Sequence, residues 1–543
     1  MFGKKTVIKT RFKSVFVASM SSMVGAYILM LTDNIAAGQI VEDEAAAAMT
    51  LVAPIAYLLI FVSYLIADGL GMMVSYAQGR QDKDEINRLF SIGIILSVVL
   101  GILFTIILIG GKEEILSLWD ISPRLMNYAA DYYSGLMFLP VIMFLNIFIY
   151  TIFIAQGREK VCLIATMVSL AVNLILDFVF CKLIGVMGIS LATLTGYIVG
   201  FIIQIYYLTG GRSELKFIRY FSLKKTLQGI LYSFYHSIDT LCLSILPLIL
   251  SSAMISLFGE ENLIVVTIAV NLLTMIFAIY TGLIDCLQPM ICQYHAENNL
   301  QSVKKTILLC LKVTAAIDLL MTVVGIIFAN FLPILFNIDD PNLVESSAEA
   351  MRYLLVFTIF LGNTMICTNY YIYIERMNYG AFVKIMLLLI LPYLSLQIKS
   401  ETLNEFWFLI GASFLVGELI NLLITKILFG GVLMIDKEKF NRQFSYDIDG
   451  NISEIKNLMP KIDADLLNLN IEKNICDKII SSVEEIGRKI IEGNKKNIQL
   501  EISILADTAQ IILMIRDNGK PLKFPAEYKY TSNGDENCIV KNF

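Results

Sequence analysis

Acidic side chains inside long apolar stretches are the residues of this sequence that could do chemistry. Asn173 and Asp177 stand four residues apart in the stretch 161–182, so helical spacing places their oxygens on one face, about one turn apart. A carboxylate beside an amide carbonyl suits a hard monovalent cation, and it equally suits a proton because burial favours the neutral carboxyl. The same pair can also make hydrogen bonds between helices. Spacing alone leaves both interpretations open.

Other acids stand inside similar stretches. Asp33 lies deep in the stretch 15–37, where it is either a second titratable group or a residue near the outer face of the membrane. A charge inside a bilayer costs at least about 2.5–3.5 kcal/mol on insertion scales, so each acid needs a reason. Three acids are candidates for lining a cavity or for making packing hydrogen bonds: Asp68, Asp239 and Asp285. Two more are expected near a polar lumen or an interface: Asp318 and Glu418.

Lysine and arginine are nearly absent from these stretches. Acids without basic partners predict bound cations or protons rather than ion pairs. Two histidines and nine scattered cysteines without a CxxC pair argue against a zinc site, so no metal is expected beyond a monovalent cation such as Na⁺ at Asn173 and Asp177. The sequence has no GxxxxGK[ST] loop, which favours transport driven by ions over transport driven by ATP.

The elements that carry these acids are expected to be membrane helices. The chain has 543 residues, of which 57% are hydrophobic and 16% charged, whereas a soluble protein is about 25% charged. This composition excludes a soluble enzyme, and the net charge of −5 argues further against a nucleic-acid partner. Twelve stretches are long enough to cross about 30 Å of hydrocarbon as helices: 15–37, 51–75, 88–110, 131–155, 161–182, 186–208, 227–251, 262–290, 305–330, 350–374, 379–397 and 404–430.

Charges in the connections predict the orientation of these helices. Lysine and arginine concentrate before the first stretch and in the even-numbered connections, which places both termini in the cytoplasm and the chain in the inner (plasma) membrane. A long basic connection at 209–226 divides the stretches into two lobes of six helices. The segments Ser75–Arg80 and Gln293–Ala296, which follow the second and eighth stretches, are weakly similar. Parallel repeats of this kind are typical of alternating-access transporters.

The last segment has a different composition. Charged residues make up 34 of the 108 residues 436–543, against 55 of the 435 residues before them. We therefore predict an all-α polytopic membrane domain with lobes at 1–215 and 216–435, followed by a small soluble α+β domain at 436–543. Its expected elements are a strand at 443–447, helices at 452–468 and 471–494, and strands at 498–505 and 511–516. The first helix is expected to break near Pro460, and no strand is expected after residue 517.

Three groups of residues in the stretch 15–430 form a recognisable pattern: Thr32-Asp33-Asn34-Ile35-Ala36-Ala37-Gly38-Gln39 with Pro54-Ile55; Gly69-Leu70-Gly71 through Gln78-Gly79; and Gln156-Gly157-Arg158 with Asn173, Asp177 and Gly188-Ile189-Ser190-Leu191-Ala192-Thr193. In these residues the chain resembles the MATE (multidrug and toxic compound extrusion) transporter family.

The resemblance implies antiport, in which an organic and often cationic substrate leaves while Na⁺ or H⁺ enters. It assigns Asp33 as the titrating acid of the first helix and Asn173 and Asp177 as ligands of the fifth. It also assigns a hydroxyl of the sixth helix, Thr193 or alternatively Thr195. Some relatives have acids in the seventh and tenth helices; this sequence offers Asp239 in the seventh and none in the tenth.

The C-terminal segment has a long predicted helix with Val483-Glu484-Glu485, and a strand pair that ends in Arg516-Asp517-Asn518-Gly519. In these residues it resembles the histidine-kinase-type ATPase domain, especially the small anti-sigma-factor kinases. It implies that Asp517 and Gly519 approach an adenine and that Glu484 is the activating acid. Arg488 stands where the family has its Mg²⁺-binding Asn. This departure favours a degenerate domain that regulates or binds a partner, with ATP as a doubtful ligand.

Three functions follow for comparison. The first is a cation-coupled exporter, which is not an enzyme and whose partners are membrane lipid, a small organic substrate and the coupling cation. The second is a flippase for lipid-linked precursors, which would carry cationic residues in its cavity. The third is a membrane sensor that signals to a cytoplasmic regulatory protein through residues 436–543.

Overall fold

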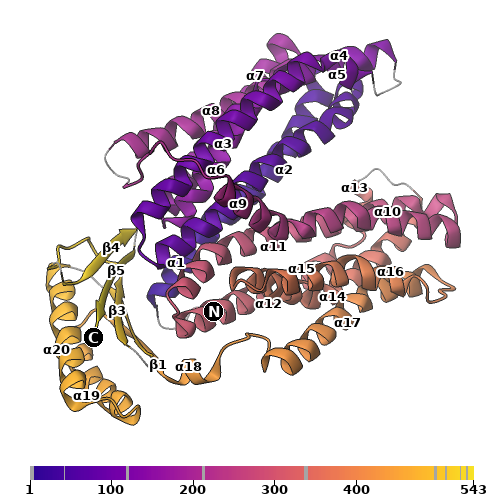
Figure 1. Ribbon diagram of the computed structural model, residues 1–543. Coiled ribbons are helices and arrows are strands. Elements are labelled where there is room, and N and C mark those ends of the chain that lie inside the picture. Colours follow the sequence, from indigo (N-terminus) through magenta and orange to yellow (C-terminus); the bar gives the residue numbers. More distant parts are fainter. Residues whose placement is uncertain are drawn as a thin grey trace. The chain divides into compact units, whose positions relative to one another are not determined.

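The computed structural model is mostly helical (Figure 1). It describes residues 5–41, 43–117, 122–210, 214–335, 340–494, 498–507, 510–525, 527–533 and 536–543. The chain forms two compact units, one made of Ser14–Phe234 and the other of Met1–Lys13 with Tyr235–Phe543. The expected domain boundaries at 215/216 and 435/436 stay predictions.

The first unit is built from helices, although α1 starts in the second unit and α9 ends there. Its elements are α1 (Val7–Ala36), η1 (Ala37–Val41), α2 (Asp43–Gly79), α3 (Lys83–Gly110), α4 (Lys112–Leu116), α5 (Pro123–Leu136), α6 (Leu139–Ala155), α7 (Glu159–Ile184), α8 (Val186–Thr209) and α9 (Leu223–His236).

The second unit combines a helical part with a sheet domain. The helical part contains α10 (Ile238–Phe258), η2 (Glu260–Asn262), α11 (Leu263–Ala296), α12 (Leu300–Ile327), α13 (Phe331–Leu335), α14 (Pro341–Tyr373), α15 (Met377–Ile385), η3 (Met386–Ile390), α16 (Leu391–Ser395) and α17 (Leu403–Phe429). The sheet domain contains α18 (Lys437–Asn441), β1 (Gln443–Asp449), α19 (Ile452–Asn468), α20 (Lys473–Gly493), β2 (Gln499–Ala506), β3 (Ile511–Asp517), β4 (Lys529–Asn533) and β5 (Glu536–Asn542).

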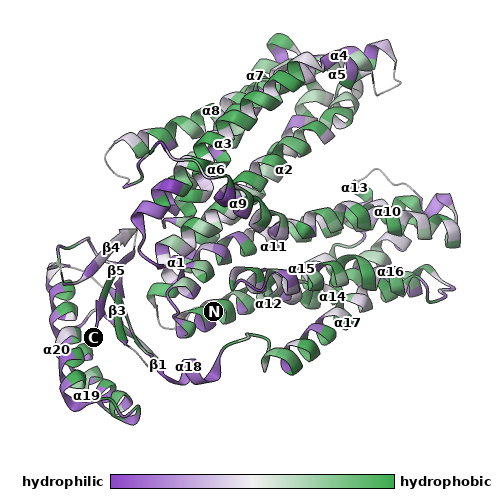
Figure 2. Cartoon of the chain, in the orientation of Figure 1, coloured by the Kyte–Doolittle hydropathy of each residue, from purple (hydrophilic) through white to green (hydrophobic). Residues whose placement is uncertain are grey.

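The long helices make this a polytopic membrane fold. In the described chain, ten helical segments are long and apolar enough to cross a membrane, and the pair α5 and α6, bent by 50°, would make an eleventh. Figure 2 shows mostly apolar residues along these helices and a mixed pattern on α19 and α20. Each of the twelve expected stretches overlaps a helix, but the count of twelve stays a prediction.

The same turn ends four of the apolar helices in the described chain, two in each unit. In each turn a residue with a left-handed backbone is followed by an N–H that donates to the carbonyl five residues earlier, at 2.8–3.0 Å, which satisfies an end carbonyl of the helix. The left-handed residues follow α2, α6, α11 and α14: Gln81, Gly157, Asn298 and Glu375. This turn recurs at the two segments, after α2 and α11, whose sequences are weakly similar.

After two of these turns, the next helices, α3 and α12, also begin with the same kind of side-chain cap. Asp82 caps α3 by accepting from the N–H of Glu85 at 3.0 Å, and Asn299 caps α12 by accepting from the N–H of Ser302 at 3.0 Å. Capping side chains of this kind satisfy N–H groups that the helix leaves free. The shared geometry supports the repeat that the sequence suggested.

The sheet domain has five antiparallel strands in the order β1-β2-β3-β5-β4. Ile502 of β2 pairs with Ile515 of β3, which pairs with Ile539 of β5. These side chains join a core with α19 and α20, which includes Ile462 and Ile486. The alternation of strand residues therefore puts the apolar face of the sheet under the two helices.

Two expectations for this domain were wrong. α19 runs without a break through Pro460, and two strands, β4 and β5, follow residue 517. Polar residues fill much of Lys529–Asn533 and Glu536–Asn542, so alternation gives a weak signal there. These strands are fixed by pairing with β3 and with each other instead.

We predict that Gly69→Ala destabilises the first unit. A Cβ at Gly69 in α2 would lie 1.8 Å from the carbonyl oxygen of Gly229 in α9, so the helices must shift at a cost of about 1–3 kcal/mol. The measurement is the thermal unfolding temperature of the purified protein in detergent. Gly110→Ala is the control, because a Cβ there meets nothing within 4 Å. Equal unfolding temperatures for both variants would contradict the prediction.

Candidate functional site

Asp33 of α1 and Asp177 of α7 meet inside the first unit, where their carboxyl groups lie within hydrogen-bonding reach of each other. Asp177 is fully buried, and Asn173, one turn earlier on α7, is 3% exposed. With its amide nitrogen turned toward Asp177, Asn173 donates to Oδ2 at 2.7 Å and to Oδ1 at 3.2 Å. The structure thus brings Asp33, Asn173 and Asp177 together.

Two carboxyl groups in contact away from water cannot both stay ionised without a proton or a cation between them. The bonds from Asn173 stabilise a negative charge on Asp177. The buried Oδ1 of Asp33 accepts no hydrogen bond from a described donor. The two carboxyl groups therefore have different polar surroundings.

Sequence reasoning missed Tyr132 of α5. Its hydroxyl lies within electrostatic reach of both Asp33 and Asp177, and also of Tyr57 in α2. Its ring packs against a small buried cluster formed by the ends of α1, α7 and α8 with η1 and α2. An aromatic residue in an apolar helix looks like ordinary core in the sequence, so only the meeting of α1, α5 and α7 identifies Tyr132.

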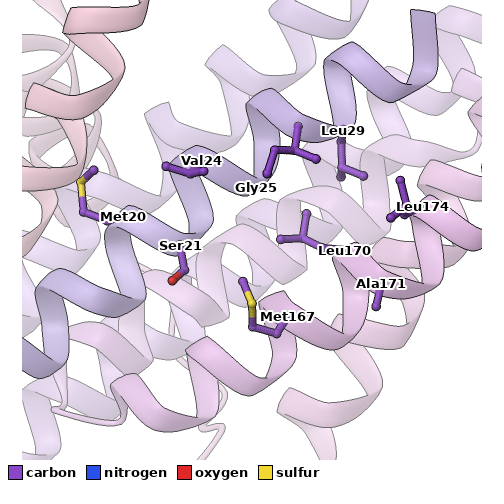
Figure 3. Close-up of a pocket in the computed structure, with 10 residues that line it drawn as sticks. Met20, Ser21, Val24, Gly25, Leu29, Met167, Leu170, Ala171 and Leu174 are labelled. Atoms are coloured by element: carbon purple, nitrogen blue, oxygen red, sulfur yellow. The ribbon is translucent and has the colours of Figure 1, made fainter. Parts of the chain in front are cut away.

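An apolar cavity of about 430 Å³ lies between α1 and α7. Figure 3 shows its lining side chains facing each other from the two helices: Met20, Ser21, Val24, Gly25, Ile28 and Leu29 from α1, and Met167, Leu170, Ala171 and Leu174 from α7. None of these side chains carries a charge. Leu29 is one turn before Asp33 and Leu174 follows Asn173, so the same two helices carry the cavity and the carboxyl pair.

The remaining candidates of the first unit are two hydroxyls on α8 and an acid on α2. Thr193 of α8 donates its hydroxyl proton to the carbonyl of Ile189 at 3.2 Å, and Thr195 donates to that of Leu191 at 2.8 Å. Each hydroxyl can then face a cation only through its oxygen. Asp68 is buried in α2.

The second unit contains a buried base that the sequence interpretation overlooked. Lys384 of α15 is fully buried and donates to the carboxylate of Asp239 at 3.1 Å, to the amide oxygen of Asn369 at 3.0 Å and to the carbonyl of His236 at 2.6 Å. The expectation that these acids lack basic partners is therefore wrong for Asp239. Asp285 is half-buried in α11.

The candidate nucleotide residues do not form one site among the described contacts. Asp517 Oδ1 accepts from the N–H of Gly519 and from Nδ2 of Asn537 in β5, both at 2.8 Å. Glu484 is paired instead with Arg488 on the exposed face of α20, at 2.8 Å. Asn537, on the strand that the sequence did not predict, thus binds one of the two carboxylate oxygens of Asp517, the residue that the resemblance assigns to adenine.

Burial raises the pKa of Asp517 from 3.8 to about 6, although the bonds from Asn537 and Gly519 oppose the rise. A carboxyl group whose pKa is higher in the folded than in the unfolded state binds its proton more tightly when the domain is folded. The free energy of unfolding of the domain therefore increases as the pH falls through about 6 toward 3.8.

We predict that lowering the pH from 7 to 5 stabilises the sheet domain by about 1 kcal/mol through Asp517. Asp517→Asn, which keeps an oxygen acceptor but does not titrate, should lack this gain. The measurement is the opening free energy of the amides of β3 and β5 by hydrogen exchange in the full-length protein. The same pH dependence in wild type and variant would show that Asp517 does not titrate in this range.

Comparisons with known proteins agree with the membrane fold. The family model described as MatE matches residues 18–179 and 237–395. The probable multidrug resistance protein YoeA of Bacillus subtilis (strain 168) is 27% identical over 221 residues, which are 37% of this chain and 46% of that protein. The multidrug export protein MepA of Staphylococcus haemolyticus (strain JCSC1435) is 26% identical over 203 residues, 36% of this chain and 45% of that protein. The chain thus spans about half the length of these relatives.

Solved structures share the fold. A MATE structure in the bent conformation aligns with a TM-score of 0.69 at 20% identity, covering 77% of this chain and 95% of that one. A transporter of the MOP superfamily from Pyrococcus furiosus, whose binding pocket is described as having reverse polarity, aligns with a TM-score of 0.70 at 20% identity, covering 78% and 98%. Because the MatE model matches more than half of the residues, this chain belongs to the MatE family, whose members are secondary transporters rather than enzymes.

Proposed function

We propose that this chain exports organic, often cationic compounds by alternating access, in exchange for Na⁺ or H⁺. The observation that carries the proposal is the contact between Asp33 and Asp177 on the two helices that also line the apolar cavity. The names of the two relatives, which concern multidrug resistance and multidrug export, support it. We place the protein in the inner (plasma) membrane with both termini in the cytoplasm, as the connection charges predict.

Protonation couples the ion to the substrate in this proposal. With one proton shared, the pair Asp33 and Asp177 carries one negative charge, and a second proton or a cation makes it neutral. A cationic substrate in the adjoining cavity is attracted to the charged pair and released when the pair is neutralised. Neutralisation also removes the cost of carrying the charge through the apolar interior, which permits the lobes to change orientation.

Asn173 can serve either coupling ion by turning its amide. With nitrogen toward Asp177 it donates to the carboxylate, as suits a shared proton. With oxygen toward Asp177 it becomes a second ligand for Na⁺, beside the carboxylates of Asp33 and Asp177. Thr193 would add its hydroxyl oxygen as a further ligand. The proton and the cation are thus alternatives at one site.

Asp68, Asp239 and Asp285 remain candidates for lining the substrate path. Lys384 already neutralises Asp239, so this acid can hold a mobile cation only after the pair separates. A flippase for lipid-linked precursors needs cationic side chains to hold a pyrophosphate, whereas the cavity between α1 and α7 has no charged lining residue. The cavity therefore fits an exporter better than a flippase.

The C-terminal domain is proposed to be a regulatory relative of the histidine-kinase-type ATPases that does not hydrolyse ATP. Arg488 stands at the position of the magnesium-binding Asn and pairs with Glu484, the candidate activating acid. Asn537 binds one carboxylate oxygen of Asp517, the candidate adenine acceptor. A sensor function for this domain, through a cytoplasmic partner protein, would use its surface rather than a bound nucleotide.

We predict that Asp33→Asn and Asp177→Asn each reduce export at least tenfold, because neither variant can exchange a charge at the pair. The measurement is dye export from vesicles under imposed proton or Na⁺ gradients. Asp84→Asn, which changes an exposed acid in the first turn of α3, is the control and should export normally. Full export by both site variants, with normal amounts in the membrane, would refute the coupling role.

A further inference from the structure

Asp318 of α12 is a fully buried acid that the export mechanism above does not use. The hydroxyl oxygen of Tyr280 in α11 lies 2.8 Å from Asp318 Oδ1 and 2.9 Å from the carbonyl oxygen of Thr358 in α14. Asp318 Oδ2 has no hydrogen-bond partner among the described residues, and a Cβ at Gly362 would lie only 2.7 Å from it. Three helices of the second unit therefore enclose this carboxyl group.

Counting protons decides the state of this carboxyl group. The hydroxyl of Tyr280 has one proton to donate but touches two acceptors. If Asp318 were ionised, it would take that proton, and the hydroxyl oxygen would face the carbonyl of Thr358 with no proton between them. If Asp318 is protonated, it donates to Tyr280, which donates to Thr358, and both contacts become hydrogen bonds. Protonation also removes an unpaired charge from the enclosed Oδ2.

The neighbouring charged groups do not offer Asp318 a cation. On α14, Asn363 follows Gly362 but bonds to Glu418 of α17. On α11 the next acid is Asp285, and on α12 the ammonium of Lys312 belongs to an exposed residue. In the described part of the chain, Tyr280 is the polar side chain that interacts with the carboxyl group of Asp318.

We propose that Asp318 is a proton-binding site in the second unit. It holds a proton in this conformation and gives it to water when α11, α12 and α14 move apart, leaving a carboxylate that takes up a proton before they close again. This inference rests on the proposed ion-coupled export and adds a proton to its cycle. With a single polar neighbour, the enclosed site lacks the ligands that Na⁺ needs, so its ligand is the proton.

Infrared spectroscopy of the purified full-length protein at pH 7 tests the proposal without transport. We expect a carbonyl band from a protonated carboxyl group that disappears in Asp318→Asn and persists in Asp177→Asn and in the control Asp84→Asn. Tyr280→Phe should shift the band, because the carboxyl group loses its acceptor. If Asp318→Asn removes no band, the proposal is overturned, whatever the export assays show for Asp33 and Asp177.

Transport provides the second test. Asp318→Asn keeps the shape of the side chain but cannot exchange a proton, so export driven by a proton gradient should fall at least tenfold and lose its pH dependence. Unchanged export and pH profile would overturn a role for Asp318 in the cycle. Failure of the Asp33 and Asp177 predictions alone would refute the proposed function instead.

An independent observation concerns the sheet domain, whose second face is polar yet buried. Opposite α19 and α20, the sheet presents Gln499, Glu501, Ser503, Arg516 and Glu536, each at most 9% exposed. Buried polar groups need partners. The partners come from the start of α1, the end of α11 and the start of α12, all within the second unit.

An ion cluster forms the centre of this contact. Arg516 of β3 pairs with Glu297, which follows α11, and its Nε lies 3.0 Å from Oε1 of Glu536. Arg11 of α1 reaches the other oxygen of Glu536 at 2.9 Å and Oε1 of Gln293 in α11 at 2.8 Å. The ring of Tyr294 lies 4.9 Å from the Arg516 guanidinium and 5.9 Å from that of Arg11.

Hydrogen bonds surround the cluster. Ser302 of α12 donates to Glu501 at 2.7 Å, and Thr10 of α1 donates to Gln499 at 2.8 Å. At the edge, Lys305 of α12 pairs with Asp447 of β1 at 2.7 Å. Through these ion pairs and hydrogen bonds, the sheet domain connects the first turns of α1 with α11 and α12.

We infer that the docked sheet domain is a brake on transport. α1 begins in the second unit and continues into the first, where it carries Asp33. A transporter must populate two conformations, and a contact that stabilises one of them slows the passage to the other. Undocking the domain should therefore speed export. This inference rests on the proposed export function.

Arg11→Gln tests the brake without changing the sheet domain itself, and Arg516→Gln tests it from the other side. We expect faster hydrogen exchange in residues 7–13 and in β5, together with export at least threefold faster than wild type. Arg488→Gln, which breaks an exposed pair of the same domain, is the control and should change neither. If the domain undocks and export is equal or slower, the proposed brake is overturned. If hydrogen exchange is unchanged in Arg11→Gln, the proposed role of Arg11 in docking the sheet domain is overturned. If Asp177→Asn still exports, the proposed function fails separately.

Discussion

A carboxyl group among apolar helices must be protonated, paired or bound to a cation, and the arrangement of both units follows from this requirement. Asp33 and Asp177 meet each other beside Asn173, Asp239 meets Lys384, and Asp318 meets Tyr280. Each solution joins at least two helices. The acids therefore determine which helices must approach closely, and the glycines allow it, as Gly362 does beside Asp318.

Much of the fold follows from sequence because long apolar runs and turn chemistry are local signals. The long helices, the pairing of Asn173 with Asp177 by helical spacing, and the first three strands of the sheet domain belong to this class. Lys384, Tyr132 and Asn537 do not, because their importance depends on partners in other elements. In the sequence, a lone lysine in an apolar stretch predicts a helix end, and a lone tyrosine predicts a core residue. Strands β4 and β5 are likewise fixed by pairing rather than by their own composition.

The two faces of the sheet domain have different neighbours. Its helices cover one face of the sheet, as the core requires, whereas the other face contacts α1, α11 and α12 instead of solvent. Burial raises the pKa of Glu297 above its ordinary value although Arg516 opposes the rise. A face committed to such contacts is no longer available for an external partner, so any partner protein would have to compete with the chain's own helices.

The pair formed by Lys384 and Asp239 has an electrical consequence. Moving one elementary charge across a membrane potential of 100 mV takes about 2.3 kcal/mol. An ammonium fixed to a carboxylate sums to zero, so this part of α10 and α15 can shift through the field without electrical work. The membrane potential would then act on the acids that gain and lose their charge. The dependence of the transport rate on membrane potential would therefore give the number of ions that these acids bind in one cycle.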